Sequence, residues 1–379
     1  MNFSLVGPVY PYRGGIAQHT TRLGLGLRAA GHCVQVLSFQ KQYPGWIYPG
    51  RDDKDPSREP VKIAAETLLA PLATNTWGNT TAKIIESRPD LVIMQYWTPY
   101  WAPAFAYLAE RLRKQAIPVV FMVHNVLPHE RLPFDRALAR ICLGQGQAFI
   151  THSQGESERL QNLLGGQIKV SCQAHPLYDY FQREDRSAAR ERLGYKPDDF
   201  LLLFFGLVRP YKGLDLLIQA LASIQPSERQ PKLLAAGEFW QKQAVFDKQI
   251  KKLGLEKAAR LDNRYIPQEE IPRLFSAADL FVAPYTDGTQ SGAVRLAMSF
   301  GMPILATEKA LATDERDYAL LKIVPPGDAV ALAKGIQAWL SGEPTMPSLR
   351  PQKLFSSQGW DNLVKELERL AVCARNWPA

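Results

Sequence analysis

Short apolar runs alternate with stretches of helical periodicity along the 379-residue chain. Runs of about four to six apolar residues are typical of buried strands, and each run here is followed by an amphipathic stretch. This pattern predicts parallel sheets built from strand–helix–strand units, and therefore an α/β fold. The predicted strands are Leu91–Met94, Val119–Val123, Ala148–Thr151, Leu201–Phe205, Leu233–Ala236, Leu280–Pro284 and Pro303–Thr307.

The chain begins with an apolar strand, a glycine-containing loop and a helix. The same pattern recurs at residues 200–224. Two such starts, about 200 residues apart, predict two Rossmann-like domains. We expect an N-terminal domain over 1–185, a linker over 186–199 with a hinge near residues 176–199, and a C-terminal domain over 200–357. A terminal helix over 358–379 is expected to complete the first domain, with apolar positions at Leu363, Leu367, Leu370 and Val372.

Two cations stand just before a predicted helix. The segment FFGLVRPYKG ends a strand at Phe205 and places Arg209 and Lys212 directly ahead of a helix that begins near Leu214. A helix N-terminus carries partial positive charge and unpaired N–H donors, so cations are disfavoured there unless an anion lies between them and the backbone. The segment therefore predicts a phosphate site.

A second turn, TDGTQSGAV, follows the strand LFVAPY and is rich in small residues, which let backbone N–H groups approach a ligand closely. Together with Arg209 and Lys212 it predicts a two-sided clamp, in which fixed cations and a helix N-terminus face one diphosphate. The alternative is that both cations are solvated loop charges. The small residues are Gly288, Thr289, Ser291, Gly292 and Ala293.

The amino-acid composition excludes few classes of protein. With 46% hydrophobic and 22% charged residues, the chain resembles ordinary globular proteins. No apolar run approaches the roughly 18 residues of a membrane span, and the N-terminal apolar core is too short for a signal peptide, so we expect a cytosolic protein. The cysteines are widely scattered and lack CxxC spacing and nearby His pairs, which argues against both a zinc site and a disulfide framework. We expect buried thiols at Cys33, Cys142, Cys172 and Cys373.

The net charge of +8 favours anionic partners. Residues 1–114 hold 13 Lys and Arg against 8 Asp and Glu, so the excess is concentrated near the N-terminus. The absence of a Lys/Arg run, of an RNP-like motif and of zinc-finger spacing argues against nucleic acid. A nucleotide, a phosphorylated acceptor or an anionic membrane surface fits as well or better.

In their order along the chain, several segments resemble the retaining family-4 glycosyltransferases (group 1). The resemblance covers nearly the whole chain and implies two Rossmann-like domains facing across a cleft, the GT-B fold. It also implies transfer of a sugar from a nucleotide-diphosphate sugar to a hydroxyl acceptor. The segments are GGIAQHTTRLGLGLRAAGH, VVFMVHN, FFGLVRPYKGLDLLIQAL, LLAAGEFW, IPQEEIPRLFSAADLFVAPY, TQSGAVRLAMSFGMPILAT and VPPGDAVALAKGI.

The resemblance also implies site residues. Arg209 and Lys212 would bind the donor diphosphate and stabilise its charge as the bond to the sugar breaks, and Gly206 lies in the same donor loop. Gly14 and Gly15, whose loop can approach a ligand closely, would cover the donor sugar; the alternative is a simple strand-to-helix turn. The distal phosphate would lie on backbone groups of Ser291, Gly292, Ala293 and Val294.

One departure concerns ribose recognition. Family members commonly carry two glutamates eight positions apart in the donor loop, and the matching positions here are Gly288 and Leu296. Neither side chain can accept a hydrogen bond. Thr289 and Gln290 are candidate substitutes, and we interpret the TQSG form as a variant that keeps the phosphate ligands.

His124 follows the predicted strand Val119–Val123, so it would point into the crevice where open α/β sheets bind ligands. An imidazole there could contact the donor sugar, orient the acceptor or accept its proton, although a lone histidine is often structural. His129 and Glu130 are close in sequence, and Glu130 is a candidate base. We expect His152 and His175 to be structural.

No metal cofactor is expected. The only Asp-x-Asp spacing, Asp53-Lys54-Asp55, lies in a polar loop, where we expect the carboxylates to be solvated. Arg209 and Lys212 would supply the charge that a divalent ion supplies in other glycosyltransferases.

Aromatic residues mark a candidate acceptor site: Tyr96, Trp97, Tyr100 and Trp101. Aromatic rings stack on sugars and also lie at membrane interfaces, and the basic residues Arg111, Arg113 and Lys114 follow. We hypothesise a saccharide or lipid-linked acceptor, such as a cell-surface glycan precursor, and peripheral contact of the N-terminal domain with the inner face of a membrane. Aromatic packing under a loop is the alternative.

Two other functions fit the same pattern. A nucleotide-sugar epimerase or hydrolase would consume donor without an acceptor, and a non-catalytic nucleotide-sugar-binding protein would bind without turnover. A dehydrogenase fits less well, because neither glycine loop has GxGxxG spacing followed by an acidic residue.

Overall fold

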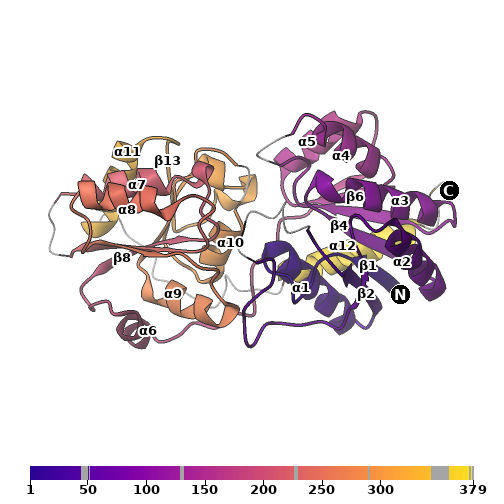
Figure 1. Cartoon of the computed structure of the whole chain (residues 1–379), viewed down its shortest axis with the longest axis horizontal. Coiled ribbons are helices and arrows are strands. Elements are labelled where there is room, and N and C mark those ends of the chain that lie inside the picture. Colours follow the sequence, from indigo (N-terminus) through magenta and orange to yellow (C-terminus); the bar gives the residue numbers. More distant parts are fainter. Residues whose placement is uncertain are drawn as a thin grey trace. The chain divides into compact units, whose positions relative to one another are not determined.

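A computed structural model of the chain contains two compact units, each described by itself (Figure 1). The first comprises Met1–Asp55, Pro60–Pro176 and Ser357–Ala379, and the second comprises Pro56–Glu59 and Leu177–Ser356. The second unit therefore includes the whole segment expected to form the linker. The structure describes residues 1–43, 50, 52–128, 132–225, 229–288, 291–342, 358–374 and 377.

The first unit contains a seven-stranded parallel sheet in the order β3-β2-β1-β4-β5-β6-β7. From β1 the chain winds outward to β2 and β3, then returns to pair β4 with the other edge of β1. This reversal is the topological switch point beside which open α/β sheets bind ligands. The strands are β1 (Asn2–Val6), β2 (Cys33–Phe39), β3 (Glu66–Leu69), β4 (Leu91–Tyr96), β5 (Val119–Val123), β6 (Ala148–Thr151) and β7 (Val170–Cys172).

Helices cover both faces of this sheet. Leu23 and Leu27 of α1 pack with Leu363 and Leu367 of α12 against one face, and the remaining helices build the core on the other. Figure 1 shows α12, in yellow, among the indigo and purple elements of the first unit. The helices are α1 (Gly15–Ala29), α2 (Thr74–Ser87), α3 (Ala102–Arg113), α4 (Asp135–Leu143), α5 (Gln154–Leu164) and α12 (Gln358–Ala374).

The second unit contains a six-stranded parallel sheet in the order β10-β9-β8-β11-β12-β13, with its switch point between β8 and β11. Helices α7, α8 and α11 pack on one face, and α6, α9 and α10 pack on the other. The elements are α6 (Arg186–Leu193), β8 (Phe200–Phe205), α7 (Leu214–Ala222), β9 (Pro231–Ala236), α8 (Gln243–Lys252), β10 (Ala259–Asp262), α9 (Ile271–Ala277), β11 (Leu280–Ala283), α10 (Gly292–Ser299), β12 (Ile304–Thr307), β13 (Leu321–Val324) and α11 (Ala329–Leu340).

The two Rossmann-like sheets confirm the predicted fold class, and each strand predicted from an apolar run is present. The strands that the pattern missed include β3, β7, β10 and β13, which lie at the sheet edges. Their side chains are largely exposed or half-buried, so they carry no continuous apolar signal.

Three smaller expectations were wrong. Val372 is 51% exposed, because it lies on the solvent side of α12. Only Cys142 is a buried thiol, whereas Cys33, Cys172 and Cys373 are exposed, and all four are free. Asp55 is buried rather than solvated, and its backbone N–H donates to the Pro11 carbonyl.

No helix among the described residues combines the length and the apolar character needed to cross a membrane.

Candidate functional site

The loop after β8 is held in place by the loop after β9. The Val208 N–H donates to the Glu238 carbonyl at 2.9 Å, and the Trp240 N–H donates to the Val208 carbonyl at 3.0 Å. The two loops approach so closely that a Cβ at Gly237, whose φ is +148°, would overlap the carbonyl oxygen of Gly206. This pairing fixes the backbone from which Arg209 projects.

Arg209 and Lys212 lie on this loop, and among the described residues neither has a counter-ion. The Arg209 guanidinium stacks 4.0 Å from the centre of the Trp240 ring, and Lys212 Nζ lies 5.3 Å from the centre of the Tyr285 ring. In the described part of the chain, neither cation forms an ion pair with a carboxylate. Burial lowers the pKa of Lys212, the Arg209 charge adds to the lowering, and Tyr211 opposes it. An anionic ligand would compensate these two charges.

The first turn of α10 lies next to Lys212. A Cβ at Gly206 would come within 3.3 Å of Lys212 Nζ and 4.0 Å of Ala293 Cβ, so the two expected sides of the clamp meet at this glycine. The Thr286 N–H donates to the Tyr211 carbonyl at 2.7 Å, which ties the loop after β11 to the loop after β8. Both features that predicted a phosphate site are therefore adjacent in the fold.

Ser291 acts as the N-cap of α10. Its hydroxyl accepts from the Val294 N–H at 3.4 Å and lies 3.0 Å from the Tyr285 hydroxyl. The cap engages the Val294 N–H, so Gly292 and Ala293 are the first-turn residues whose N–H groups have no acceptor within the helix. The N–H groups of Gly292 and Ala293 are therefore placed to donate hydrogen bonds to a phosphate oxygen.

In the first unit, Gly14 precedes α1 with φ +101°, a conformation that favours glycine, and no atom lies within 4 Å of the position its Cβ would occupy. Gly15 is the first residue of α1 and is exposed. The space beside the Gly14 backbone is thus open.

His124 follows β5 directly and is only 4% exposed. Its Nε2 lies 2.6 Å from Gln95 Oε1, and a Cβ at Gly7 would lie 2.7 Å from Gln95 Cγ, so a glycine there makes room for this partner. Burial lowers the pKa of His124 well below its usual range, and the neighbouring His152 and His175 lower it further. The ring is therefore neutral at neutral pH.

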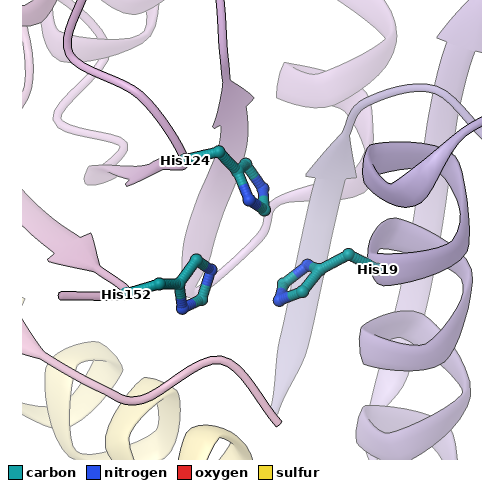
Figure 2. Close-up of side chains that lie close together, drawn as sticks. All are labelled: His19, His124 and His152. Atoms are coloured by element: carbon teal, nitrogen blue, oxygen red, sulfur yellow. The ribbon is translucent and has the colours of Figure 1, made fainter. Parts of the chain in front are cut away.

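Sequence analysis missed a buried histidine beside His124. His19 extends from α1 with 1% of its surface exposed, and Figure 2 shows its ring pointing toward His124, at the end of β5, and His152, at the end of β6. Ring centroids of these three residues lie 4.8 to 5.0 Å apart, and His175 lies 5.1 Å from His19 and 5.2 Å from His152. We call these four residues the histidine cluster.

Family models match both halves of the chain. The model described as Glycosyltransferase Family 4 matches residues 13–171, and the model described as Glycosyl transferases group 1 matches residues 199–342. The chain belongs to glycosyltransferase family 4.

Several sugar transferases are moderately similar in sequence to this chain. The chain is 27% identical over 278 residues to D-inositol 3-phosphate glycosyltransferase 1 of Catenulispora acidiphila, covering 67% of this chain and 66% of the relative. It is also 27% identical over 232 residues to GDP-mannose:glycolipid 4-beta-D-mannosyltransferase of Xanthomonas campestris pv. campestris, covering 59% and 58%. The chain thus spans about two thirds or less of the length of these relatives.

Solved structures share the fold of nearly the whole chain. Sucrose-phosphate synthase from Thermosynechococcus elongatus superimposes with a TM-score of 0.73 at 19% identity, covering 98% of this chain and 99% of that chain. Anabaena HepE in complex with UDP gives a TM-score of 0.67 at 19% identity, covering 96% and 94%. At this level of identity the likeness concerns the fold alone.

The structure gives a physical reason for the departure from the family-4 donor loop. Gly288 has φ +136°, and a Cβ there would lie 2.6 Å from the Lys309 carbonyl oxygen, so this backbone path excludes a glutamate. Leu296 is buried in the core of the second unit. Thr289 and Gln290, the candidate substitutes, lie outside the described residues, as do His129 and Glu130.

The acceptor prediction was wrong for two of its four aromatic residues. Tyr96 and Trp101 are fully buried in the core of the first unit and have no surface with which to stack on a sugar. Trp97 and Tyr100 are half-buried, and the Trp97 indole N–H donates to the Tyr43 hydroxyl at 2.7 Å. Packing under a loop therefore explains the two buried rings, and Trp97 and Tyr100 remain acceptor candidates.

Proposed function

We propose that this family-4 chain transfers a sugar from a nucleotide-diphosphate sugar to a hydroxyl acceptor, with retention of configuration and without a metal ion on the diphosphate. The observation that carries the proposal is the pair Arg209 and Lys212 beside the first turn of α10, which has no carboxylate partner among the described residues. Fixed cations and free N–H donors are suited to a diphosphate. The names of the relatives, which are sugar transferases, support the reaction class.

In the proposed reaction, the bond between the sugar's anomeric carbon and the diphosphate oxygen breaks, and the electron pair stays on the diphosphate. Lys212 and Arg209 stabilise that developing charge. The acceptor hydroxyl oxygen bonds to the anomeric carbon on the face that the diphosphate leaves, and its proton passes to a phosphate oxygen. Because the leaving group takes the proton, this route needs no protein base.

The other candidate site residues would assist the transfer reaction. The open loop at Gly14 and Gly15 would cover the donor sugar and exclude water. Glu130 would be the base if a protein group assists the acceptor, and His124 would contact the sugar.

A thermal-shift panel tests the donor site. We expect one series among UDP-, GDP-, ADP- and dTDP-sugars to raise the melting temperature of the chain, and the Arg209→Ala/Lys212→Ala protein to lose that response. Lys248→Ala, which removes an exposed lysine of α8, is the matched control and should respond like the unmodified chain. Stabilisation that survives in the double variant would contradict the assignment of the phosphate site.

We further propose a lipid-linked acceptor presented at an anionic membrane, supported by a surface near α4. Leu132, Phe134 and Ile141 are exposed by 56%, 56% and 59%, and Phe134 and Ile141 lie seven residues apart, about two helical turns. The exposed Arg136 and Arg140 flank them. Apolar side chains beside cations are suited to an anionic lipid surface.

Vesicle flotation tests this surface. We expect the chain to bind vesicles containing phosphatidylglycerol at low salt and to bind neutral phosphatidylcholine vesicles less, because part of the attraction is electrostatic. Phe134→Ser/Ile141→Ser should abolish binding. The control Val245→Ser/Val330→Ser removes two valines of the second unit that are exposed by 59% and 61%, and should leave binding unchanged. Equal flotation of the two double variants would refute the surface.

A further inference from the structure

We propose that Trp240 is a positioning residue of the phosphate site, and that its ring holds the Arg209 guanidinium in the orientation that a phosphate needs. The inference rests on the proposed function and deepens it, because it assigns the group that orients one of the two cations. The guanidinium carbon of Arg209 lies 4.0 Å from the centre of the Trp240 ring. Both residues belong to the second unit, and both are half-buried.

Contact with the ring leaves the hydrogen-bonding edge of Arg209 available. A guanidinium is planar and stacks on aromatic rings by its face, while its N–H donors point outward in the plane. Among the described residues, no oxygen accepts a hydrogen bond from the Arg209 guanidinium. The side chain is therefore held by one group and can donate to another.

Orientation matters more for Arg209 than for Lys212. An arginine side chain has many rotamers, and a ligand that fixes it must overcome the lost entropy. An ammonium group acts as a point charge, whereas a two-pronged bond from a guanidinium to a phosphate requires one particular plane. The attraction between a cation and an aromatic ring fixes that plane before the diphosphate binds.

The backbone of Trp240 is anchored next to the cation that it holds. The Trp240 N–H donates to the Val208 carbonyl at 3.0 Å, and Val208 directly precedes Arg209. On the other side, the Phe239 N–H donates to the Asn263 side-chain oxygen at 2.9 Å, which ties this loop to the loop after β10. The ring and the guanidinium thus project from two backbone segments that are bonded to each other.

A buried carboxylate borders the indole of Trp240. Glu238 is 3% exposed, and its Oε2 lies 3.4 Å from Trp240 Nε1, which donates to it. The Glu238 carbonyl also accepts from the Val208 N–H at 2.9 Å, so Glu238 contacts both loops. The side-chain contact is near the upper limit of hydrogen-bond length, so we assign the main effect on Arg209 to the ring itself.

A different role for Trp240 makes an opposite prediction. A half-buried tryptophan beside a phosphate site could instead stack on the nucleotide base. Inorganic pyrophosphate has no base and would meet only the groups that bind phosphate. A positioning role therefore changes the affinity for pyrophosphate, whereas a base-stacking role leaves it unchanged.

Isothermal titration of the full chain with inorganic pyrophosphate tests the assignment. We expect Arg209→Ala to weaken binding by about 10- to 100-fold and Trp240→Ala by about 3- to 30-fold. Trp240→Phe, which keeps an aromatic ring, should recover most of the loss, and Trp240→Leu should not. In the Arg209→Ala background, Trp240→Ala should change the affinity by less than about twofold, because the two residues act as one unit.

The matched control is Trp339→Ala, which removes a half-buried tryptophan of α11 in the same unit. It should bind pyrophosphate within about twofold of the unmodified chain. Unchanged affinity in Trp240→Ala would overturn the positioning role, and so would a full additional loss in the Arg209→Ala background. If Trp240→Ala does not fold, equal affinities of Trp240→Phe and Trp240→Leu would overturn it.

Failure of the proposed phosphate site has a different signature. In that case Arg209→Ala itself would leave the affinity for pyrophosphate unchanged, and both the phosphate site and the role of Trp240 would be refuted. If Arg209→Ala weakens binding and Trp240→Ala does not, the phosphate site stands and only the positioning role is refuted.

Discussion

Lys212→Ala is expected to lower kcat for sugar transfer by about 100- to 1,000-fold, the range typical for removal of one group that stabilises charge in a transition state. The ammonium group lies beside the first turn of α10 without a carboxylate partner among the described residues, so its charge is available to the leaving diphosphate. Initial-rate kinetics with the stabilising donor measure the effect. The loss should fall mainly on kcat, because the charge on the diphosphate grows as the bond breaks.

The control for this prediction is again Lys248→Ala, an exposed lysine on α8 of the same unit. It should keep kcat within about twofold, since a solvated surface charge contributes little. A Lys212→Ala enzyme with unchanged kcat would remove Lys212 from the mechanism.

Gly213→Ala is expected to disrupt the donor site and to destabilise the second unit strongly. Gly213 joins Lys212 to α7 with φ +69°, and a Cβ there would overlap the carbonyl oxygen of Pro284. Because the obstacle is backbone, the loop after β8 must separate from the loop after β11. Melting temperature and donor-induced stabilisation should both fall.

Gly254 is a closely matched control. Its φ is +68°, nearly that of Gly213, but no atom lies within 4 Å of the position its Cβ would occupy. Gly254→Ala should therefore cost only the about 1–2 kcal/mol of a left-handed conformation, while Gly213→Ala should cost at least about 2 kcal/mol more. Similar melting temperatures for the two variants would show that the close contact with Pro284 contributes nothing.

Local sequence signals were sufficient to predict that the two loops of the proposed donor site lie together. Arg209 and Lys212 stand between an apolar strand and a helix, and the small residues near Gly292 repeat that arrangement. In parallel sheets, loops at the carboxyl ends of neighbouring strands converge, so adjacency of the two loops follows from the fold class. The structure bears out this adjacency at Gly206.

The aromatic prediction was wrong for Tyr96 because β4, which Tyr96 ends, gives no signal about which way its side chains point. All six of its residues are buried, so the strand has no polar face and alternation carries no information. An aromatic residue at the end of such a strand can face the core as readily as the crevice.

His19 was missed although a signal was present. It lies four and eight residues before Leu23 and Leu27, so it occupies a core position of α1. A histidine on the apolar face of a helix, one turn after a glycine loop, could have been paired with the strand-end His124 and His152. By contrast, the close approach of Gly288 to the Lys309 carbonyl depends on tertiary packing that no local pattern reveals.

Analysis of the products formed from the donor tests the proposed sugar transfer. The chain is incubated with the nucleotide sugar that stabilises it, with and without a lipid extract as acceptor source, and the sugar is followed by NMR. We expect the donor to be consumed mainly when acceptor is present, and the sugar to appear in a glycoside with the anomeric configuration it had in the donor. Free or epimerised sugar formed without acceptor, an inverted product, or donor binding without turnover would contradict the proposed transfer.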